Sequence, residues 1–230
     1  MQAVILAAGL GTRMRELCHD CPKPMVRILG KPLLEWRLET LPSEIDEVIL
    51  VVGYLQEQIR EYFGEEWKGR KIIYITQEAL NGTAGALELV REFLRGSALV
   101  TMGDDLYHKE DLVKLMQVTN EGGGVLGLYV NDASPFGLLS VDDDKNLKSV
   151  IERPHGEKEG TVCIGGYLIT TKYFDFPKVA ISETEYGLPQ TLVAVSKEYP
   201  VCVISATAWQ PVGSPEDIPK AEAFIREYFL

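Results

Sequence analysis

Val4-Ile5-Leu6-Ala7-Ala8-Gly9-Leu10-Gly11-Thr12-Arg13-Met14 lies near the start of the chain, and Pro22-Lys23-Pro24-Met25-Val26 follows it. The hydrophobic run predicts a buried strand, and the glycines after it predict a tight loop whose backbone can approach a ligand closely. Backbone N–H groups in such a loop bind phosphate oxygens. Arg13 and Lys23 add fixed positive charge beside them. The stretch therefore predicts a triphosphate site built from a glycine-rich loop and two cations.

The spacing of the glycines excludes two better-known phosphate motifs. Met14 takes the third glycine position of G-x-G-x-x-G, and no Gly-Lys-Ser or Gly-Lys-Thr follows at the spacing of a P-loop. Taken alone, the loop also fits a tight turn that exposes an arginine. Together with Pro-Lys-Pro-Met, however, Leu-Ala-Ala-Gly-Leu-Gly-Thr-Arg-Met closely resembles the signature of the sugar-1-phosphate nucleotidylyltransferases, which make nucleotide-activated sugars. The resemblance implies nucleotide contacts from Leu6, Ala7, Ala8, Gly9, Gly11 and Thr12.

The composition suits one globular α/β domain of ordinary size. The chain has 230 residues, of which 46% are hydrophobic, enough for a substantial core. Its formal net charge of −11 argues against a nonspecific nucleic-acid binder, because such proteins carry an excess of basic residues. Basic residues nevertheless cluster near the glycine loop, where their field suits an anionic small molecule. They are Arg13, Arg15, Lys23, Arg27 and Lys31.

No targeting or membrane segment is expected. The first residues lack a basic region before the apolar run, and no segment approaches the roughly 20 apolar residues of a membrane span. We therefore expect a cytoplasmic protein whose four cysteines are free thiols. Cys18 and Cys21 have C-x-x-C spacing, but no second pair of ligands accompanies them as a zinc site would need. An ordinary loop is favoured there over a redox pair.

The first half of the chain alternates strand and helix patterns. Aliphatic and β-branched runs predict strands, and apolar residues at helical spacing predict the helices between them. This order predicts an α/β fold of Rossmann-like, three-layer α/β/α architecture with a mostly parallel central sheet. The resemblance implies the same fold, of the nucleotide-diphospho-sugar transferase type. The predicted strands are 3–8, 47–52, 71–76 and 98–102, and the predicted helices are 32–38, 56–63 and 83–94.

The second half is predicted to contain strands separated by turns. They cover 124–130, 138–141, 147–151, 161–169 and 201–205, and helices follow over 188–197 and from 215 onwards. We expect a single domain over 1–230, with about 1–120 binding the nucleotide and about 121–230 binding the sugar phosphate. Some family members carry a C-terminal β-helix with acyltransferase activity. The 230 residues leave no room for it, so a second activity is not expected.

Asp104 follows the fourth predicted strand, in the sequence Gly103-Asp104-Asp105. Ligands of such folds bind beyond the carboxyl ends of the strands, so this carboxylate is expected to face the crevice. The implied reaction joins two polyanions, and Mg²⁺ prefers one or two carboxylates together with phosphate oxygens and water. The resemblance implies that Asp104 is the metal ligand, with Asp105 as an additional group. The alternative role of Asp104 is to cap a helix over 106–116.

Gln77 and the stretch Asn81-Gly82-Thr83-Ala84-Gly85-Ala86 resemble the base-reading segment of the family. The glutamine amide donates and accepts in the plane of a pyrimidine edge, and Gly82 lets the base lie against the backbone. Gln77 therefore favours UTP or dTTP, although Gly-Thr-Ala-Gly-Ala-Leu also occurs in family members that use guanine. The resemblance implies nucleotide contacts from Gln77, Gly82 and Thr83. A structural role stays open beside this one, with Asn81 as a helix N-cap and Gly82 in a turn.

A second set of residues is implied to bind the sugar phosphate. Ile151-Glu152-Arg153-Pro154 resembles the family's Glu-Lys-Pro, in which the glutamate binds sugar hydroxyls and the lysine binds the phosphate. Arg153 replaces that lysine and binds phosphate as a planar fork. Cys163 takes the position of a family asparagine. The implied acceptor contacts are Gly137, Glu152, Arg153, Gly165 and Glu185.

One departure from the family pattern is serious. The stretch Trp209-Gln210-Pro211-Val212-Gly213-Ser214-Pro215-Glu216-Asp217 resembles Trp-x-Asp-Ile-Gly-Thr-Pro-Glu-Asp, whose first aspartate is the second metal ligand. Pro211 stands in its place and offers no side-chain ligand. Three outcomes are open: Asp104 holds the metal with phosphates and water, Asp105 or Gln210 substitutes, or activity is lost. The residues from Ser214 to Asp217 predict a helix start.

The leading interpretation is nucleotidyl transfer with Mg²⁺ as cofactor. An oxygen of the sugar 1-phosphate attacks the α-phosphorus of an NTP, and pyrophosphate leaves. Arg13, Lys23 and Asp104 catalyse the step through positioning and charge stabilisation. One alternative is a catalytically weak or silent sugar-nucleotide-binding regulatory protein, which Pro211 motivates. Another is cytidylyl or guanylyl transfer to a different phosphate acceptor. The expected partners are an NTP and a sugar 1-phosphate, without nucleic acid or membrane, and a homo-oligomer is left open.

Overall fold

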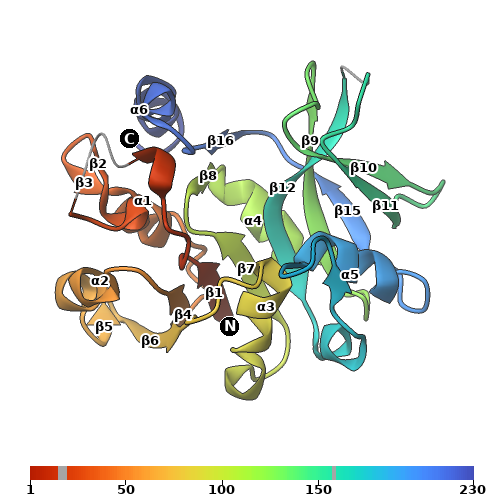
Figure 1. The fold of residues 1–230 in the computed structure, drawn as a ribbon, viewed down its shortest axis with the longest axis horizontal. Coiled ribbons are helices and arrows are strands. Elements are labelled where there is room, and N and C mark those ends of the chain that lie inside the picture. The colour runs from red at the N-terminus through yellow and green to blue at the C-terminus, as the bar shows by residue number, and fades with distance from the viewer. Residues whose placement is uncertain (15–19, 157–158) are drawn as a thin grey trace.

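A sheet of ten strands organises the part of the chain that the structure, a computed structural model, describes: residues 1–14, 20–156 and 159–230. In Figure 1 a parallel set of strands lies to the left of β7, and a mainly antiparallel set lies to its right. The parallel set is β1 (Gln2–Leu6), β4 (Glu47–Val52), β6 (Arg70–Thr76) and β7 (Ala98–Met102), with β5 (Glu66–Trp67) antiparallel at its edge. The other set is β9 (Gly124–Val130), β10 (Gly137–Val141), β11 (Leu147–Glu152), β12 (Gly160–Ile169) and β15 (Cys202–Ser205), the last parallel to β9.

Helices cover both faces of the parallel strands. Successive residues of a strand point to opposite faces, and β1 follows this rule. Ala3 and Ile5 share a hydrophobic cluster with α1 (Leu33–Glu39), α2 (Gln56–Phe63) and α4 (Lys109–Met116). Val4 and Leu6 share another with α3 (Thr83–Glu88) and α5 (Leu188–Val195). All residues of β1 and β4 are buried, and the predicted three-layer α/β/α architecture is confirmed.

The C-terminal helix packs against N-terminal segments rather than against the sheet. Ala221, Phe224 and Ile225 of α6 (Ile218–Tyr228) share a third cluster with Met14 and Trp36. Figure 1 shows α6, in blue, beside the red segments near the start of the chain. The 3₁₀ turn η5 (Pro215–Asp217) precedes α6, and Ser214 and Asp217 form a capping box there. The helix start predicted over these residues is confirmed.

Short elements connect the layers. The ribbons are β2 (Arg27–Ile28) with β3 (Lys31–Pro32), β8 (Asp105–Tyr107) with β16 (Trp209–Pro211), and β13 (Val179–Ala180) with β14 (Tyr186–Gly187). The remaining 3₁₀ turns are η1 (Thr12–Met14), η2 (Lys23–Met25), η3 (Arg91–Phe93) and η4 (Thr171–Asp175).

Two predicted helices differ from the observed ones. The helix predicted over 83–94 ends at Glu88, and the chain continues through η3 before it enters β7. Leu89 and Phe93, apolar residues within that range, are exposed. The helix considered over 106–116 starts only at Lys109, because Leu106 pairs with Gln210 in the β8–β16 ribbon. Capping of a helix by Asp104 is therefore wrong.

The structure also corrects the expectation of free thiols. Cys21 is disulfide-bonded, whereas Cys163 and Cys202 are free, and Cys18 lies outside the described residues. The expectation followed from the compartment and gave too little weight to C-x-x-C spacing, which redox motifs use. No helix in the described part of the chain is long and apolar enough to cross a bilayer.

Candidate active site

Three adjoining cavities meet at Met102, the last residue of β7. The loop cavity, about 100 Å³, lies between the glycine loop, η2 and the end of β7. The helix cavity, about 240 Å³, lies against the start of α3. The strand cavity, about 330 Å³, lies over β10, β11 and β12. They open beyond the carboxyl ends of β1 and β7, where an α/β fold binds its ligands.

The loop cavity contains an ion pair. The Lys23 ammonium lies 2.5 Å from Asp104 Oδ2, and prolines on both sides hold Lys23 in η2. Gly11 has a φ of +58°, and a Cβ there would lie 2.6 Å from Lys23 Cβ. Only glycine therefore lets the loop pass this close to the lysine. The arrangement places a cation and a carboxylate together at the strand ends.

Asp105 differs from its neighbour Asp104. It is buried on β8 and accepts a hydrogen bond from Tyr107 Oη at 3.3 Å. Burial raises the pKa of Asp105 well above its ordinary value, and the charge of Asp104 adds to the effect. Asp105 is also placed differently from Asp104, because it lines the strand cavity, whereas Asp104 lines the loop cavity beside Lys23.

The β8–β16 register places Pro211 directly opposite Asp105. The next residue, Val212, donates its N–H to the carbonyl oxygen of Asp104 at 2.9 Å. Gln210 donates its side-chain amide to the carbonyl of Pro211 at 2.7 Å, so this amide already has a partner. No cluster of three or more acidic, histidine or cysteine side chains suited to a metal occurs in residues 1–14, 20–156 and 159–230. Among the described residues that line the loop cavity, Asp104 is the one with a carboxylate.

The helix cavity is lined by Gln77 and by the loop that starts α3. Gln77 is buried and donates its amide to Asn81 Oδ1 at 3.1 Å. Gly82 has a φ of +88°, and a Cβ there would overlap the backbone of Tyr186. Tyr186 donates its N–H to the carbonyl of Asn81 at 2.9 Å. Glycine at position 82 is therefore required by both its conformation and its neighbour. Because Gly82 itself is the N-cap residue, the alternative role of Asn81 as N-cap is wrong.

The strand cavity is lined by polar groups from β8, β11, β12 and α5. Glu152 ends β11 opposite Gly137 of β10. The Cys163 sulfur lies 3.3 Å from the hydroxyl oxygen of Tyr167. Burial raises the pKa of the Cys163 thiol, which disfavours the thiolate that a nucleophilic cysteine needs. The cavity thus offers groups for binding hydroxyls rather than a covalent nucleophile.

Most of the predicted site residues line these cavities. They are Leu6, Ala7, Ala8, Gly9, Lys23, Gln77, Gly82, Thr83, Asp104, Gly137, Glu152, Gly165 and Glu185. Glu185 was expected at the sugar but lines the helix cavity, beside Gln77. Gly11 packs against Lys23 but does not line the loop cavity. Thr12 is exposed on η1.

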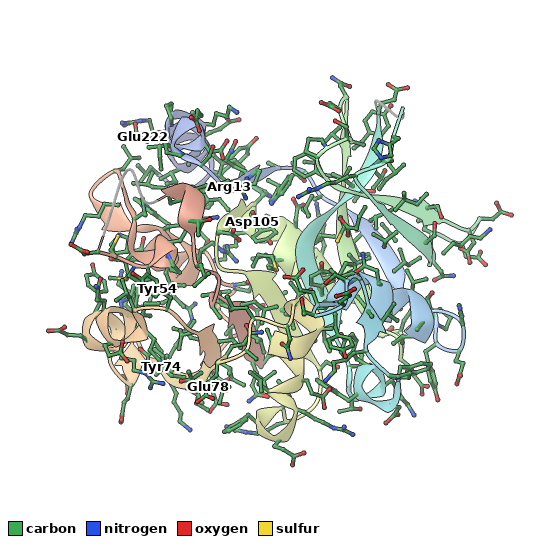
Figure 2. All side chains as sticks on the ribbon, viewed as in Figure 1. Arg13, Tyr54, Tyr74, Glu78, Asp105 and Glu222 are labelled. Atoms are coloured by element: carbon green, nitrogen blue, oxygen red, sulfur yellow. The ribbon has the colours of Figure 1, made fainter. Side chains whose placement is uncertain are left out.

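The structure places both predicted arginines outside the three cavities. Arg13 is exposed on η1 and lies beside Gly213, in the loop before η5 (Figure 2). Arg153 is exposed just after β11, with a φ of +46°, and donates its N–H to the carbonyl of Phe136. Neither is among the residues that line the loop, helix or strand cavity. Both remain predicted ligands at the rim.

Sequence reasoning missed three residues of the site. Met102 lines all three cavities, and its place at the end of a predicted strand was a signal that went unused. Gln190 and Trp209 line the strand cavity. Both come from segments distant in sequence from β11, so no local pattern could have placed them there.

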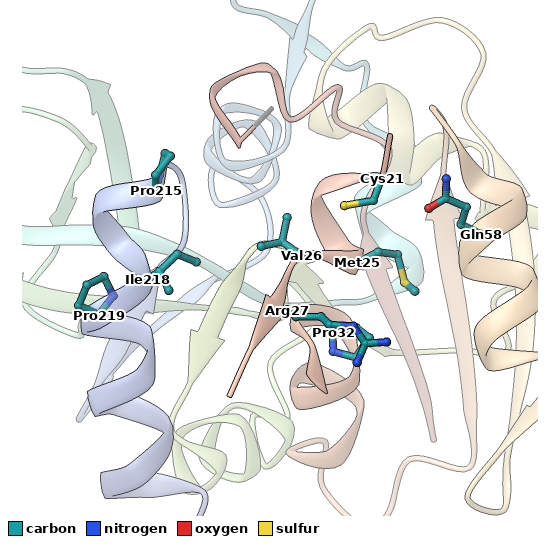
Figure 3. A pocket seen from close by; sticks show the side chains of 9 residues that line it. All are labelled: Cys21, Met25, Val26, Arg27, Pro32, Gln58, Pro215, Ile218 and Pro219. Atoms are coloured by element: carbon teal, nitrogen blue, oxygen red, sulfur yellow. The ribbon is translucent and has the colours of Figure 1, made fainter. Parts of the chain in front are cut away.

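A larger cavity, about 680 Å³, lies apart from these three, behind η2 (Figure 3). It is bounded by Met25 of η2, Gln58 of α2 and Ile218 of α6. Arg27 is the one charged residue among those of its lining that the structure describes. A lining without carboxylates suits a triphosphate and its metal poorly, so volume alone does not mark the active site.

Comparison with known proteins identifies the family. The sequence pattern of the nucleotidyl transferase family matches residues 2–228. The chain is 40% identical over 177 residues to a D-glycero-α-D-manno-heptose 1-phosphate guanylyltransferase of Campylobacter jejuni, covering 76% of this chain and 78% of that protein. It is 30% identical over 236 residues to the UTP–glucose-1-phosphate uridylyltransferase AglF of Haloferax volcanii, covering 99% and 97%.

A solved structure shares the fold. It is a Bacillus anthracis protein assigned as a glucose-1-phosphate thymidylyltransferase, which superposes with a TM-score of 0.87 over 100% of this chain and 97% of that one. Its sequence identity is 20%, so the likeness concerns the architecture alone.

Proposed function

The chain belongs to the nucleotidyl transferase family, and from that premise we propose that it transfers a nucleotidyl group from an NTP to a sugar 1-phosphate, releasing pyrophosphate. The observation that carries the proposal is the junction at Met102. A loop cavity with a cation and a carboxylate adjoins one cavity suited to a base and meets, at Met102, another suited to a polyol. Three such cavities at one junction suit two substrates that react at a phosphate.

The residues of the loop cavity serve phosphate chemistry. Backbone N–H groups of the glycine loop and Arg13 hold the triphosphate, while Lys23 stabilises charge at the α-phosphate. A sugar phosphate oxygen attacks the α-phosphorus in line, the bond to the β-phosphate oxygen breaks, and pyrophosphate leaves. No covalent enzyme intermediate is needed. The chain contributes positioning and charge stabilisation.

Asp104 is the residue that fits a Mg²⁺ ion. Its carboxylate is 40% exposed at the strand end, so solvent and phosphate oxygens have access to it. Mg²⁺ is commonly held by one or two carboxylates plus substrate phosphates and water, a mode that Asp104 suits without a second carboxylate. Bound there, the ion would neutralise charge on the phosphate oxygens. Lys23, which pairs with Asp104 in the structure, would add positive charge beside the same phosphate.

The acceptor is assigned to the strand cavity. Glu152 accepts hydrogen bonds from sugar hydroxyls, and Gly137 and Gly165 line the same cavity. Arg153 reaches the sugar phosphate from the rim. The cavity of about 330 Å³ suits a ligand of monosaccharide size.

For the donor base we propose UTP or dTTP, because the Gln77 amide can pair with the edge of a pyrimidine. The guanylyltransferase of Campylobacter jejuni, at 40% identity, supports GTP as the second candidate. Pro211, opposite Asp105, supports a further candidate, a sugar-nucleotide-binding protein without turnover.

A pyrophosphate-release assay tests these candidates together. UTP, dTTP, GTP, CTP and ATP are each combined with glucose, mannose, heptose and N-acetylglucosamine 1-phosphates in the presence of Mg²⁺. Release with one pair supports the enzyme and names its substrates. Tight binding of an NDP-sugar without release for any pair supports the non-catalytic candidate and overturns the transferase.

A further inference from the structure

The exposed Glu152 carboxylate has one side-chain hydrogen-bond partner among the described residues, an amide. Gln190 of α5 donates its Nε2–H to Glu152 Oε1 at 2.8 Å. No cation lies within ion-pair distance of this carboxylate in residues 1–14, 20–156 and 159–230. Cys163 and Tyr167 also line the strand cavity, and they pair with each other: the Cys163 sulfur lies 3.3 Å from the Tyr167 hydroxyl oxygen. The orientation of Glu152 therefore depends on Gln190.

Two glycines clear the space that this hydrogen bond needs. A Cβ at Gly187, just before α5, would overlap the Gln190 side-chain amide. A Cβ at Gly137 would lie 3.0 Å from Glu152 Oε1, tighter than an ordinary contact. The amide thus lies along the start of α5, and the carboxylate folds back over the β10–β11 hairpin. Both side chains line the strand cavity.

The pair adds a polar contact between two elements that already pack against each other, β11 and α5. Glu152 belongs to the hairpin at the edge of the sheet, and Gln190 to the helix that covers one face. The hydrogen bond occupies one oxygen of the carboxylate and leaves lone pairs of both oxygens for other donors. A carboxylate fixed in this way accepts hydroxyl hydrogens without first losing side-chain freedom.

We propose that Gln190 is a positioning residue that orients Glu152 toward the hydroxyls of the acceptor and so sets the affinity for the acceptor. The inference rests on the proposed function, because it needs a hydroxyl-bearing acceptor in the strand cavity. Gln190 acts through Glu152. Its contribution therefore disappears once the carboxylate is removed.

A double-mutant cycle tests this dependence. Gln190→Met keeps an unbranched side chain of similar length and removes the donor. It is expected to raise the KM for the sugar 1-phosphate by about tenfold, the loss of one hydrogen bond to a charged group, and to leave the KM for the NTP unchanged. In a Glu152→Ala background the same substitution has no further effect on the acceptor KM. Gln117→Met, at an exposed glutamine after α4, is the matched control and retains wild-type constants.

Gln190→Glu is the second variant. It preserves the shape of the side chain, exchanges the donor for an acceptor, and is expected to raise the acceptor KM at least as much as Gln190→Met. Thermal unfolding of each variant confirms that it is folded. Additive effects in the cycle, or a rise in the KM for the NTP instead, overturn the role of Gln190. Wild-type protein without turnover for any substrate pair overturns the proposed function itself, and the two failures are thus distinguishable.

Discussion

The two sides of β7 are built differently. On the nucleotide side, β1 and β4 are parallel and buried along their whole length. On the acceptor side, the hairpin of β10 and β11 is antiparallel and exposes about half of its residues. Strands buried on both faces tolerate little change, because every side chain is packed. The nucleotide side carries the motifs that closely resemble the family signature, whereas the departures Arg153, Cys163 and Pro211 all follow β7 in the sequence. We therefore expect the chemistry on the rigid side and acceptor choice on the open side.

The largest expected effect concerns the rigid side. Lys23→Ala removes the cation of the loop cavity and is expected to lower turnover by a factor on the order of 100, about 3 kcal/mol of transition-state stabilisation, for every acceptor. Pyrophosphate release at saturating substrates measures it. Lys148→Ala, at an exposed lysine of β11, is the control. A change that depends on which sugar phosphate is supplied would break the division between the two sides.

The next effect concerns the contact between α4 and the segment that precedes β16. Asp111 of α4 accepts hydrogen bonds from the N–H groups of Thr207 and Ala208, which precede β16. Asp111→Asn is expected to lower the free energy of unfolding by about 2 kcal/mol at pH 7, because buried donors lose a charged acceptor. Denaturant unfolding measures the difference.

The same variant has a predicted pH dependence. Burial raises the pKa of Asp111, but the hydrogen bonds from Lys114 and Thr207 outweigh it and hold the pKa below its ordinary value. The stabilisation is therefore fully present above the unfolded pKa of about 3.9 and is lost as the pH falls through the lower folded pKa. Wild type and variant should converge in stability only in strong acid. A gap that closes already at neutral pH would contradict this.

A smaller effect is expected within the helix cavity, where Asn81 accepts a hydrogen bond from the side-chain amide of Gln77. Asn81→Leu removes this acceptor and is expected to raise the KM for the NTP by about tenfold. Asn81→Asp keeps an acceptor oxygen and should retain the wild-type value. The KM for the sugar phosphate stays unchanged in both variants. If the KM for the sugar phosphate rises together with the KM for the NTP, the base and acceptor sites are less separate than the two halves of the sheet indicate.

The smallest effect concerns the departure at Pro211. Pro211→Asp adds a carboxylate next to β8 and is expected to lower the Mg²⁺ concentration for half-maximal turnover by about threefold, the size of a partly exposed charge interaction. Pro211→Ala, which removes the ring without adding charge, is the control and should leave the Mg²⁺ requirement unchanged. An equal shift in both variants would mean that proline itself, through backbone rigidity, sets the requirement.

Local patterns predicted the long elements well. The bounds of β4, α2 and β9 agree with the expected ranges, because aliphatic runs and helical spacing report burial directly. The end of α3 was missed, since apolar residues continue to Leu94 although the chain must turn toward β7. The strands β13 and β16, each of two or three residues, depend on distant partners and carry no local signal.

Motif resemblance found most of the residues that line the cavities but not the groups that orient them. Lys23 and Asp104 were predicted separately, and their ion pair follows from the approach of η2 to β7. The burial of Asp105 depends on Pro211 and Trp209 coming from the far end of the chain. Asn81 and Gln190 act on residues that were predicted, across contacts that only the folded chain creates.

The wall between the helix and strand cavities has an evolutionary consequence. Thr83 lines both, and its hydroxyl accepts the N–H of Leu188 at 2.9 Å, at the start of the helix that carries Gln190. If the base and the sugar bind as proposed, we expect a substitution at Thr83 to alter both sites together. We therefore expect new acceptors to arise more easily through the open hairpin, whereas a change of nucleotide would need compensating changes on both sides of the wall.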